Sequence, residues 1–209
     1  NGIVIDRQKC SLCFDCVAAC PTGAMRKMGK WYSLEEVIEI VKKDEMFYKN
    51  SGGGLTLSGG EVLRQSEFAS GLLEKAKELG IHTAIETSGY AQWDGFKKVL
   101  ENTDLVLYDI KVADRDLHRR LTGRDNDFIL ANARMLAMQG VPIHIRLVVV
   151  PGLNDSLEEL SARMEIVSEL STVEQVDLLP YHRFGVGKYA QLSLDYPLEG
   201  VEEHSEEAI

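Results

Sequence analysis

The chain has 209 residues, of which 44% are apolar, and a formal net charge of −10. That length fits one domain with or without a small appendage, and the apolar content is sufficient for a buried core. The acidic balance argues against general binding to nucleic acid or to an anionic membrane surface, and no apolar run reaches the length of a membrane span.

The four cysteines of the chain all lie in its first 20 residues, in the stretch "KCSLCFDCVAACP". They are spaced C-x2-C-x2-C-x3-C-P, at Cys10, Cys13, Cys16 and Cys20. Thiolates at this spacing bind [4Fe–4S] clusters in bacterial ferredoxins, where the fourth cysteine serves the other cluster when two are present. Clustered thiols also favour a reducing cytoplasm over a disulfide framework. We therefore predict an iron–sulfur site rather than zinc or free thiols, either complete or half of a two-cluster unit.

The remainder of the chain reads as helices and strands in alternation. Apolar residues at helical spacing and glycine stops predict helices over residues 33–47, 66–79, 93–100, 127–139 and 156–170. Short apolar runs between them predict strands over residues 55–57, 81–89, 104–111, 142–152 and 173–182. Such alternation indicates parallel βαβ units, and right-handed crossovers would form them into an open barrel or a doubly wound sheet.

Polar residues stand where the predicted strands end, which is the place where parallel α/β folds bind ligands. They are Ser58, Gly59, Gly60 and Glu61 after the first strand, Glu86, Thr87 and Ser88 at the second, Asp109 and Lys111 at the third, Arg146 on the fourth and His182 after the fifth. Because each of the five strands contributes, we predict one ligand site at this edge of the sheet.

The glycine-rich stretch "SGGGLTLSGGE" matches neither a phosphate-binding P-loop nor a dinucleotide fingerprint. Its glycines would let a ligand approach the backbone, and Glu61 could accept a hydrogen bond from an ammonium group. A tight strand-to-helix turn with no ligand explains the glycines equally well.

The charged residues leave several alternatives open. Glu86 and Asp109 could form an acid/base pair, bind a cation, or pair with Lys111 and Arg146. Arg146 lies in the apolar run "PIHIRLVVV", so it has to meet a carboxylate of the protein or of a ligand. His182 could contact a ligand or be a satisfied core histidine.

Taken together, "SGGGLTLSGGEVLRQ", "GIHTAIETSGY", "DLVLYDIK", "IRLVVVPGLND" and "LPYHRFGVGKY" resemble a known family. The family is that of the glycyl-radical-enzyme activating enzymes of the pyruvate formate-lyase activating type, which are radical S-adenosylmethionine (SAM) proteins. The resemblance implies a partial (β/α)6 barrel over residues 31–209 that lacks its first strand. It also implies that residues 1–30 are half of a ferredoxin-like insert.

The resemblance further implies ligands for the strand-end residues. The amino group of SAM would lie against Ser58 to Glu61, and its carboxylate near Lys111 and Arg146. His182 would lie near the ribose or adenosine. A monovalent cation beside SAM would meet Glu86, Thr87 and Asp109. In the subgroup with the insert, one auxiliary cluster takes Cys10, Cys13 and Cys16, and Cys20 serves the other.

The activity that the resemblance implies is an oxidoreductase reaction on a protein. A 5′-deoxyadenosyl radical made from SAM takes a hydrogen atom from a glycine of a partner glycyl radical enzyme, with a flavodoxin- or ferredoxin-type protein as electron donor. The radical motif C-x3-C-x2-C is absent from these 209 residues and is expected upstream of Asn1. The chain is therefore expected to be truncated at both ends, with Ser205 starting a further helix, to contain no catalytic residue of its own, and to be inactive alone.

Three other functions remain open on the sequence. One is a radical SAM enzyme that acts on a different substrate. Another is a ferredoxin-type electron-transfer module fused to a catalytically inert barrel. The third is an aldolase-like barrel with Lys111 as a Schiff base, which the neighbouring Asp109 disfavours because it would keep the lysine charged.

Overall fold

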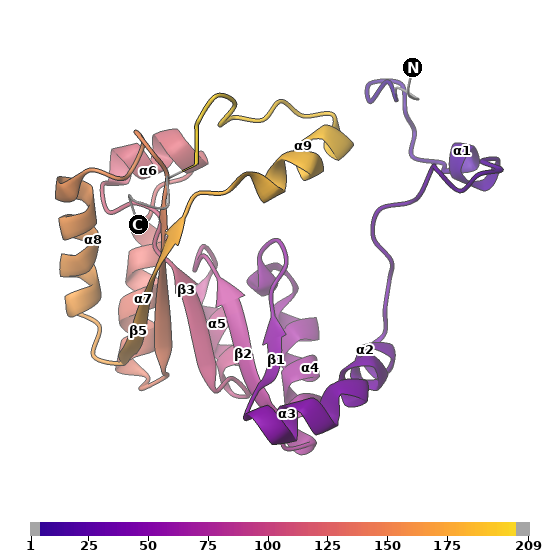
Figure 1. The fold of residues 1–209 in the computed structure, drawn as a ribbon. Coiled ribbons are helices and arrows are strands. Elements are labelled where there is room, and N and C mark those ends of the chain that lie inside the picture. Colours follow the sequence, from indigo (N-terminus) through magenta and orange to yellow (C-terminus); the bar gives the residue numbers. More distant parts are fainter. Residues whose placement is uncertain (1–4, 204–209) are drawn as a thin grey trace. The chain divides into compact units, whose positions relative to one another are not determined.

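The computed structural model describes residues 5–203, so the helix start predicted at Ser205 lies outside the described residues. The described chain divides by its internal contacts into two compact units (Figure 1). They comprise residues 5–33 with Phe184–Glu199, and Leu34–Arg183 with residues 200–203. The predicted domains, residues 1–30 and 31–209, stay a prediction.

The first unit contains two short helices that the sequence did not predict. These are α1 (Asp15–Ala18) and α9 (Val186–Leu192), and neither contains a buried residue. The guanidinium of Arg7 donates a hydrogen bond of 2.8 Å to the carbonyl of Gln191, which connects the beginning of the described chain to α9. Without an apolar face to bury, neither helix produces the periodic signal on which sequence prediction depends.

The second unit is built on a sheet of five parallel strands. The strands are β1 (Gly54–Leu57), β2 (His82–Thr87), β3 (Leu105–Asp109), β4 (Ile143–Val149) and β5 (Val173–Pro180). The predicted parallel sheet is thus confirmed, and its spatial order is the order of the chain. A doubly wound sheet would reverse its order at a switch point, so the order found here is that of a partial barrel.

In this unit two α-helices precede β1, and helices follow each of the first four strands in the chain (Figure 1). The α-helices of this unit are α2 (Leu34–Val41), α3 (Glu45–Ser51), α4 (Ser66–Glu78), α5 (Trp93–Leu100), α6 (Arg115–Thr122), α7 (Asp127–Met138) and α8 (Leu157–Ser168). The 3₁₀ turns are η1 (Lys42–Asp44), η2 (Val62–Gln65) and, at the boundary of the two units, η3 (Arg183–Gly185). Within residues 5–203 no helix is long and apolar enough to cross a membrane.

The single helix predicted over residues 33–47 is wrong. α2 ends at Val41, η1 follows, and α3 continues beyond the predicted end to the left-handed Gly52 (φ 68°). The apolar repeat that supported the prediction is buried only as far as Val41, where Ile38 and Val41 face the core. Because η1 and α3 bury no residue, tertiary packing does not enforce one continuous helix there.

Helix α6 was missed because six of its eight residues, RDLHRRLT, are polar. Its ends nevertheless carry ordinary signals. The carboxylate of Asp114 accepts a hydrogen bond of 2.6 Å from the backbone N–H of Leu117, and the left-handed Gly123 ends the helix. The residues at its two ends therefore indicate this helix, although its sequence has no apolar period by which hydrophobic patterning could find it.

The two faces of the central strands differ in burial. Side chains of one face pack into the core against α4, α5 and α7, and they include Val106, Tyr108, Ile143, Ile145 and Leu147. Side chains of the other face are half-buried, and they include Leu107, Asp109, His144 and Arg146. Since successive residues of a strand point to opposite faces, this alternation places the predicted site on the half-buried side.

The buried side chain of Tyr108 fills the space beside Gly89, which follows β2. The hydroxyl of Tyr108 donates a hydrogen bond of 2.6 Å to the carbonyl of Ile129, and burial raises the pKa of this phenol well above its ordinary value. A Cβ atom at Gly89 would lie 1.7 Å from that hydroxyl oxygen, and Gly89 has a φ of +75°. Both the space and the backbone conformation therefore require glycine.

We expect Gly89→Ala to lower the free energy of unfolding by about 2–5 kcal/mol, since a left-handed backbone costs about 1–2 kcal/mol and an overpacked core about 1–3 kcal/mol. Gly140→Ala is the matched control, because Gly140 has the same φ of +75° but open space where its Cβ would lie. It should lose only about 1–2 kcal/mol for its backbone. Equal losses in urea denaturation would show that Tyr108 does not close the space at position 89.

Candidate functional site

The loop after β1 presents open backbone. Ser58, Gly59 and Gly60 connect β1 to η2, and Gly59 adopts a φ of +135° that only glycine tolerates well. A Cβ atom built on Gly59 or on Gly60 would meet no other atom within 4 Å. The loop thus leaves space in which a ligand can approach the peptide groups.

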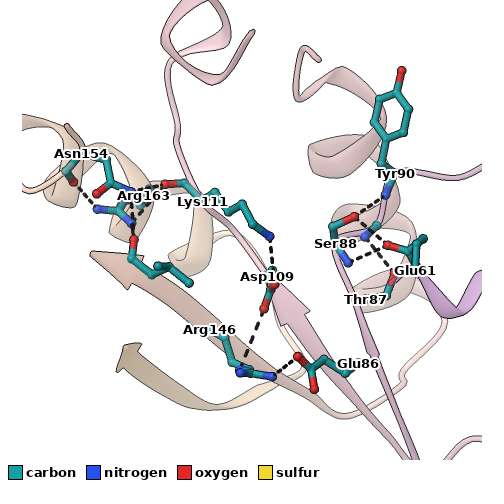
Figure 2. Close-up of polar contacts among 12 residues, drawn as sticks. Glu61, Glu86, Thr87, Ser88, Tyr90, Asp109, Lys111, Arg146, Asn154 and Arg163 are labelled. Carbon is teal, nitrogen blue, oxygen red and sulfur yellow. Dashed lines mark hydrogen bonds and ion pairs between the residues drawn. The ribbon is translucent and has the colours of Figure 1, made fainter. Parts of the chain in front are cut away.

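The carboxylate of Glu61 connects this loop to the end of β2 (Figure 2). Its Oε1 accepts hydrogen bonds from the Thr87 hydroxyl (2.6 Å) and the Leu63 N–H (3.2 Å). Its Oε2 accepts from both the N–H (3.0 Å) and the hydroxyl (2.7 Å) of Ser88. A carboxylate has about four acceptor positions, so all of them are occupied. We call Glu61, Thr87 and Ser88 the Glu61 clasp.

The Glu61 clasp bears on two of the predicted ligand contacts. For Glu61 to accept a bond from a ligand's ammonium group it would first have to release one of its protein donors, so that contact stays a prediction. Thr87 lies next to Glu86 in the chain, but the two side chains point to opposite faces of β2. The structure therefore brings the Thr87 side chain to Glu61 and not to the other acids of the site.

Four charged side chains form a second group on the half-buried face of the sheet (Figure 2). Arg146 lies beside Asp109 in the pairing of β4 with β3. Its Nη1 is 2.7 Å from Oε1 of Glu86, and its Nε is 3.9 Å from Oδ1 of Asp109. Oδ2 of Asp109 accepts a hydrogen bond of 2.9 Å from Nζ of Lys111. Arg146 thus meets carboxylates as its sequence context demanded, and we call these four residues the charged cluster.

One oxygen of the charged cluster has no donor among the described residues. Oδ1 of Asp109 is buried and makes no hydrogen bond, because Nε of Arg146 at 3.9 Å is too distant. A buried acceptor without a donor is costly. It lies beside the cationic groups of Lys111 and Arg146, so the cluster offers an unused acceptor next to two strong donors. A ligand carboxylate for the two donors, together with a cation for the free acceptor, is complementary to this arrangement.

Sequence reasoning missed three buried polar residues close to the charged cluster, namely Asn154, Glu159 and Arg163. Arg163 of α8 donates to the carbonyls of Val148 (3.1 Å) and Lys111 (3.4 Å), so it reaches the segment that carries the cluster's lysine. A signal was present in the sequence. Glu159 and Arg163 are four residues apart on the inward face of α8, where an apolar pair is expected.

His182 and the four cysteines complete the predicted set. His182 lies two residues beyond β5 and is exposed. Cys10, Cys13 and Cys16 are exposed in the first unit, and Cys20 is half-buried. Hydrogen bonds to its sulfur from the N–H of Met25, and then from Thr22, lower the pKa of Cys20 to about 7.

The thiols suit an iron–sulfur cluster by their chemistry, because thiolates at this spacing are its usual ligands. Their described positions do not converge, since residues 5–203 contain no group of three His, Cys, Asp or Glu side chains placed to hold a metal ion. Cluster binding by the cysteine run therefore stays a prediction.

The chain is similar to proteins of one superfamily. The model of the radical SAM superfamily matches residues 9–164. The choline trimethylamine-lyase activating enzyme of Oleidesulfovibrio alaskensis is 42% identical over 183 residues, which are 86% of this chain and 59% of the relative. This chain therefore spans about three-fifths of that relative's length.

Two further similarities cover more of the related protein. The trans-4-hydroxy-L-proline dehydratase activating enzyme of Clostridioides difficile is 39% identical across 99% of this chain and 79% of the relative. The crystal structure of a domain of pyruvate-formate lyase-activating enzyme from Bacteroides vulgatus matches with a TM-score of 0.61 and 29% identity, over 75% of this chain and 88% of that one. The chain belongs to the radical SAM superfamily and, within it, to the glycyl-radical-enzyme activating enzymes.

Proposed function

We propose that these residues form the SAM-binding part of an enzyme that installs a glycyl radical in a partner protein. When bound, a reduced [4Fe–4S] cluster would supply one electron to the sulfonium of SAM, whose C–S bond would break to give methionine and a 5′-deoxyadenosyl radical that takes a hydrogen atom from glycine. The observation that carries the proposal is the unused acceptor of Asp109 beside Lys111 and Arg146.

In this proposal the charged cluster binds the methionine end of SAM. The ammonium of Lys111 and the guanidinium of Arg146 hold the carboxylate, as their charge and hydrogen-bonding capacity allow. The ammonium group of SAM lies against the open backbone of Ser58, Gly59 and Gly60. Glu61 shapes that loop through the Glu61 clasp, and a hydrogen bond from it to SAM requires one of its present donors to move.

Further contacts follow the family resemblance. His182 contacts the ribose or adenosine, and its position beyond the end of β5 puts it on the same edge of the sheet as the other strand-end residues. A monovalent cation beside SAM takes Oδ1 of Asp109, with Glu86 and the backbone of Thr87 as neighbours. The Thr87 hydroxyl is bound to Glu61, so it is not assigned to the cation.

The cysteine run is proposed to hold auxiliary iron–sulfur clusters, Cys10, Cys13 and Cys16 at one and Cys20 at another. This belongs to a ferredoxin-like insert of which these residues are one half. The thiols would have to close around the iron from their described positions. The cysteines of the radical cluster are proposed to lie in a part of the protein that precedes Asn1.

The partner is proposed to be a glycyl radical enzyme, because the curated relatives are named as activating enzymes of lyases and dehydratases. A target glycine within a polypeptide has to reach the bound SAM as a loop, and a partial barrel with an open side admits one. The electron is proposed to come from a flavodoxin- or ferredoxin-type protein.

Mixing the reduced, iron-loaded full-length protein, including the part proposed to precede Asn1, with SAM and a glycyl radical enzyme should produce an organic radical in the partner, together with 5′-deoxyadenosine. Electron paramagnetic resonance detects the radical, and chromatography measures the nucleoside. A partner whose target glycine is replaced by alanine is the control and should give no radical signal. If 5′-deoxyadenosine forms and no partner radical appears, the enzyme acts on a different substrate.

Lys111→Met should weaken SAM binding about 10- to 100-fold, because a hydrogen bond between charged groups contributes about 1.5–3 kcal/mol. Lys75→Met is the matched control. Lys75 has a similarly exposed side chain, 39% against 38%, and also faces a carboxylate, yet it lies on α4. Equilibrium dialysis under anaerobic conditions measures both. Equal affinities would remove the charged cluster from SAM binding and favour an electron-transfer module on an inert barrel.

Replacing Cys10, Cys13 and Cys16 together by alanine should lower the bound iron by about four atoms per chain, the content of one [4Fe–4S] cluster. Ser11→Ala, within the same run, should leave the iron content unchanged. Iron is measured by a colorimetric assay on anaerobically purified protein. An unchanged iron content in the triple variant contradicts the assignment of these cysteines.

A further inference from the structure

Backbone pairing between β3 and β4 stops just before the lysine of the charged cluster. Its last hydrogen bond runs from the N–H of Ile110 to β4. One residue later, the carbonyl of Lys111 accepts from Nδ2 of Asn154 (2.7 Å) and Nη1 of Arg163 (3.4 Å). The same two side chains donate to the carbonyl of Val148 in β4, at 2.9 and 3.1 Å. The side chains of Asn154 and Arg163 therefore connect the two chain segments just beyond the point where the backbone hydrogen bonds between β3 and β4 end (Figure 2).

These side chains are themselves firmly held. Arg163 is fully buried, and its Nη2 donates a hydrogen bond of 2.6 Å to the carbonyl of Asn154. Its Nε lies 3.5 Å from the carboxylate of Glu159. Glu159 in turn accepts a hydrogen bond of 2.5 Å from the N–H of Ala113. We call Asn154, Glu159 and Arg163 the Lys111 support.

A buried ion pair is an expensive way to stabilise a fold. Removing two charges from water costs several kcal/mol, and well-packed apolar residues of similar volume are often as stable or more so. What an apolar core cannot do is bind backbone carbonyls and so fix a loop in one position. The loop fixed here carries Lys111, whose ammonium reaches Asp109 in the charged cluster.

We propose that Asn154 and Arg163 are positioning residues, which fix the backbone of Lys111 against β4 so that its ammonium and the guanidinium of Arg146 meet one carboxylate together. The inference rests on the proposed function as regards the ligand, SAM. Lysine has a long, flexible stem, so the place of its ammonium depends on where its backbone is anchored. The two carbonyls that Asn154 and Arg163 both bind belong to the strand of Arg146 and to the residue Lys111 itself.

A double-mutant cycle tests this. Asn154→Ser removes the two hydrogen bonds that Nδ2 donates and the one that Oδ1 accepts from the N–H of Val150, and should weaken SAM binding about five- to tenfold. In a Lys111→Met background the same change should weaken it less than about twofold, because no ammonium remains to be positioned. Equilibrium dialysis is performed at a temperature where circular dichroism shows each variant to be folded. If Asn154→Ser does not fold, Arg163→Lys, which keeps the charge and loses the guanidinium fork, takes its place.

The matched control is Asn132→Ser. Asn132 is equally buried, and its Nδ2 also donates to two backbone carbonyls, those of Gly89 (2.8 Å) and Ala91 (2.9 Å). Any effect of this change should be the same with and without Lys111. An equal effect of Asn154→Ser in both backgrounds, or no effect in a folded variant, overturns the proposal and leaves the support with a purely structural role.

A second readout needs no SAM. Acetylation of lysines in the ligand-free protein, followed by mass spectrometry, should modify Lys111 severalfold faster in Asn154→Ser than in the unchanged protein, with Lys75 as internal reference. If the unchanged protein does not bind SAM, the proposed function fails while this measurement still decides the positioning role. Unchanged acetylation of Lys111 in the variant overturns that role.

Discussion

The guanidinium of Arg146 imposes the strongest constraint on the second unit. It lies on the central part of a strand whose neighbours are apolar, and a charge in such a place has to be neutralised. Glu86 from β2 and Asp109 from β3 do so, which ties three consecutive strands together across one face of the sheet. The helices α4, α5 and α7 pack on the other face, and the charged face remains available for a ligand.

The strands could be predicted because burial on the helix side makes each one an apolar run, and parallel pairing follows from the helices between them. The strand-end residues could be predicted as a group for the same reason. The sequence could not show that these residues form two separate groups, the Glu61 clasp and the charged cluster. Glu61 and Thr87 belong to different motifs, and only the pairing of β1 with β2 brings Glu61 to the Thr87 hydroxyl.

Other features escaped prediction for separate physical reasons. α6 has no apolar period, because its ends and not its faces define it. Arg163 was not singled out, because its place on the inward face of α8 does not reveal that two strand-end carbonyls need a donor inside the fold. The cysteine run is easily recognised, since its spacing is itself the signal, whereas the positions of the thiols depend on a cofactor that the chain alone does not supply.

The full occupancy of the Glu61 carboxylate has a consequence for how this protein can evolve. Each of its acceptor positions is matched to one donor. A change at Ser88 that deletes the hydroxyl therefore leaves one acceptor position of Glu61 without a donor, and a change at Glu61 leaves several donors without an acceptor at once. Single substitutions in the Glu61 clasp are therefore costly while compensated pairs are tolerable. Positions 61, 87 and 88 should covary across homologous sequences as one inherited unit, although they lie in two separate stretches of the chain.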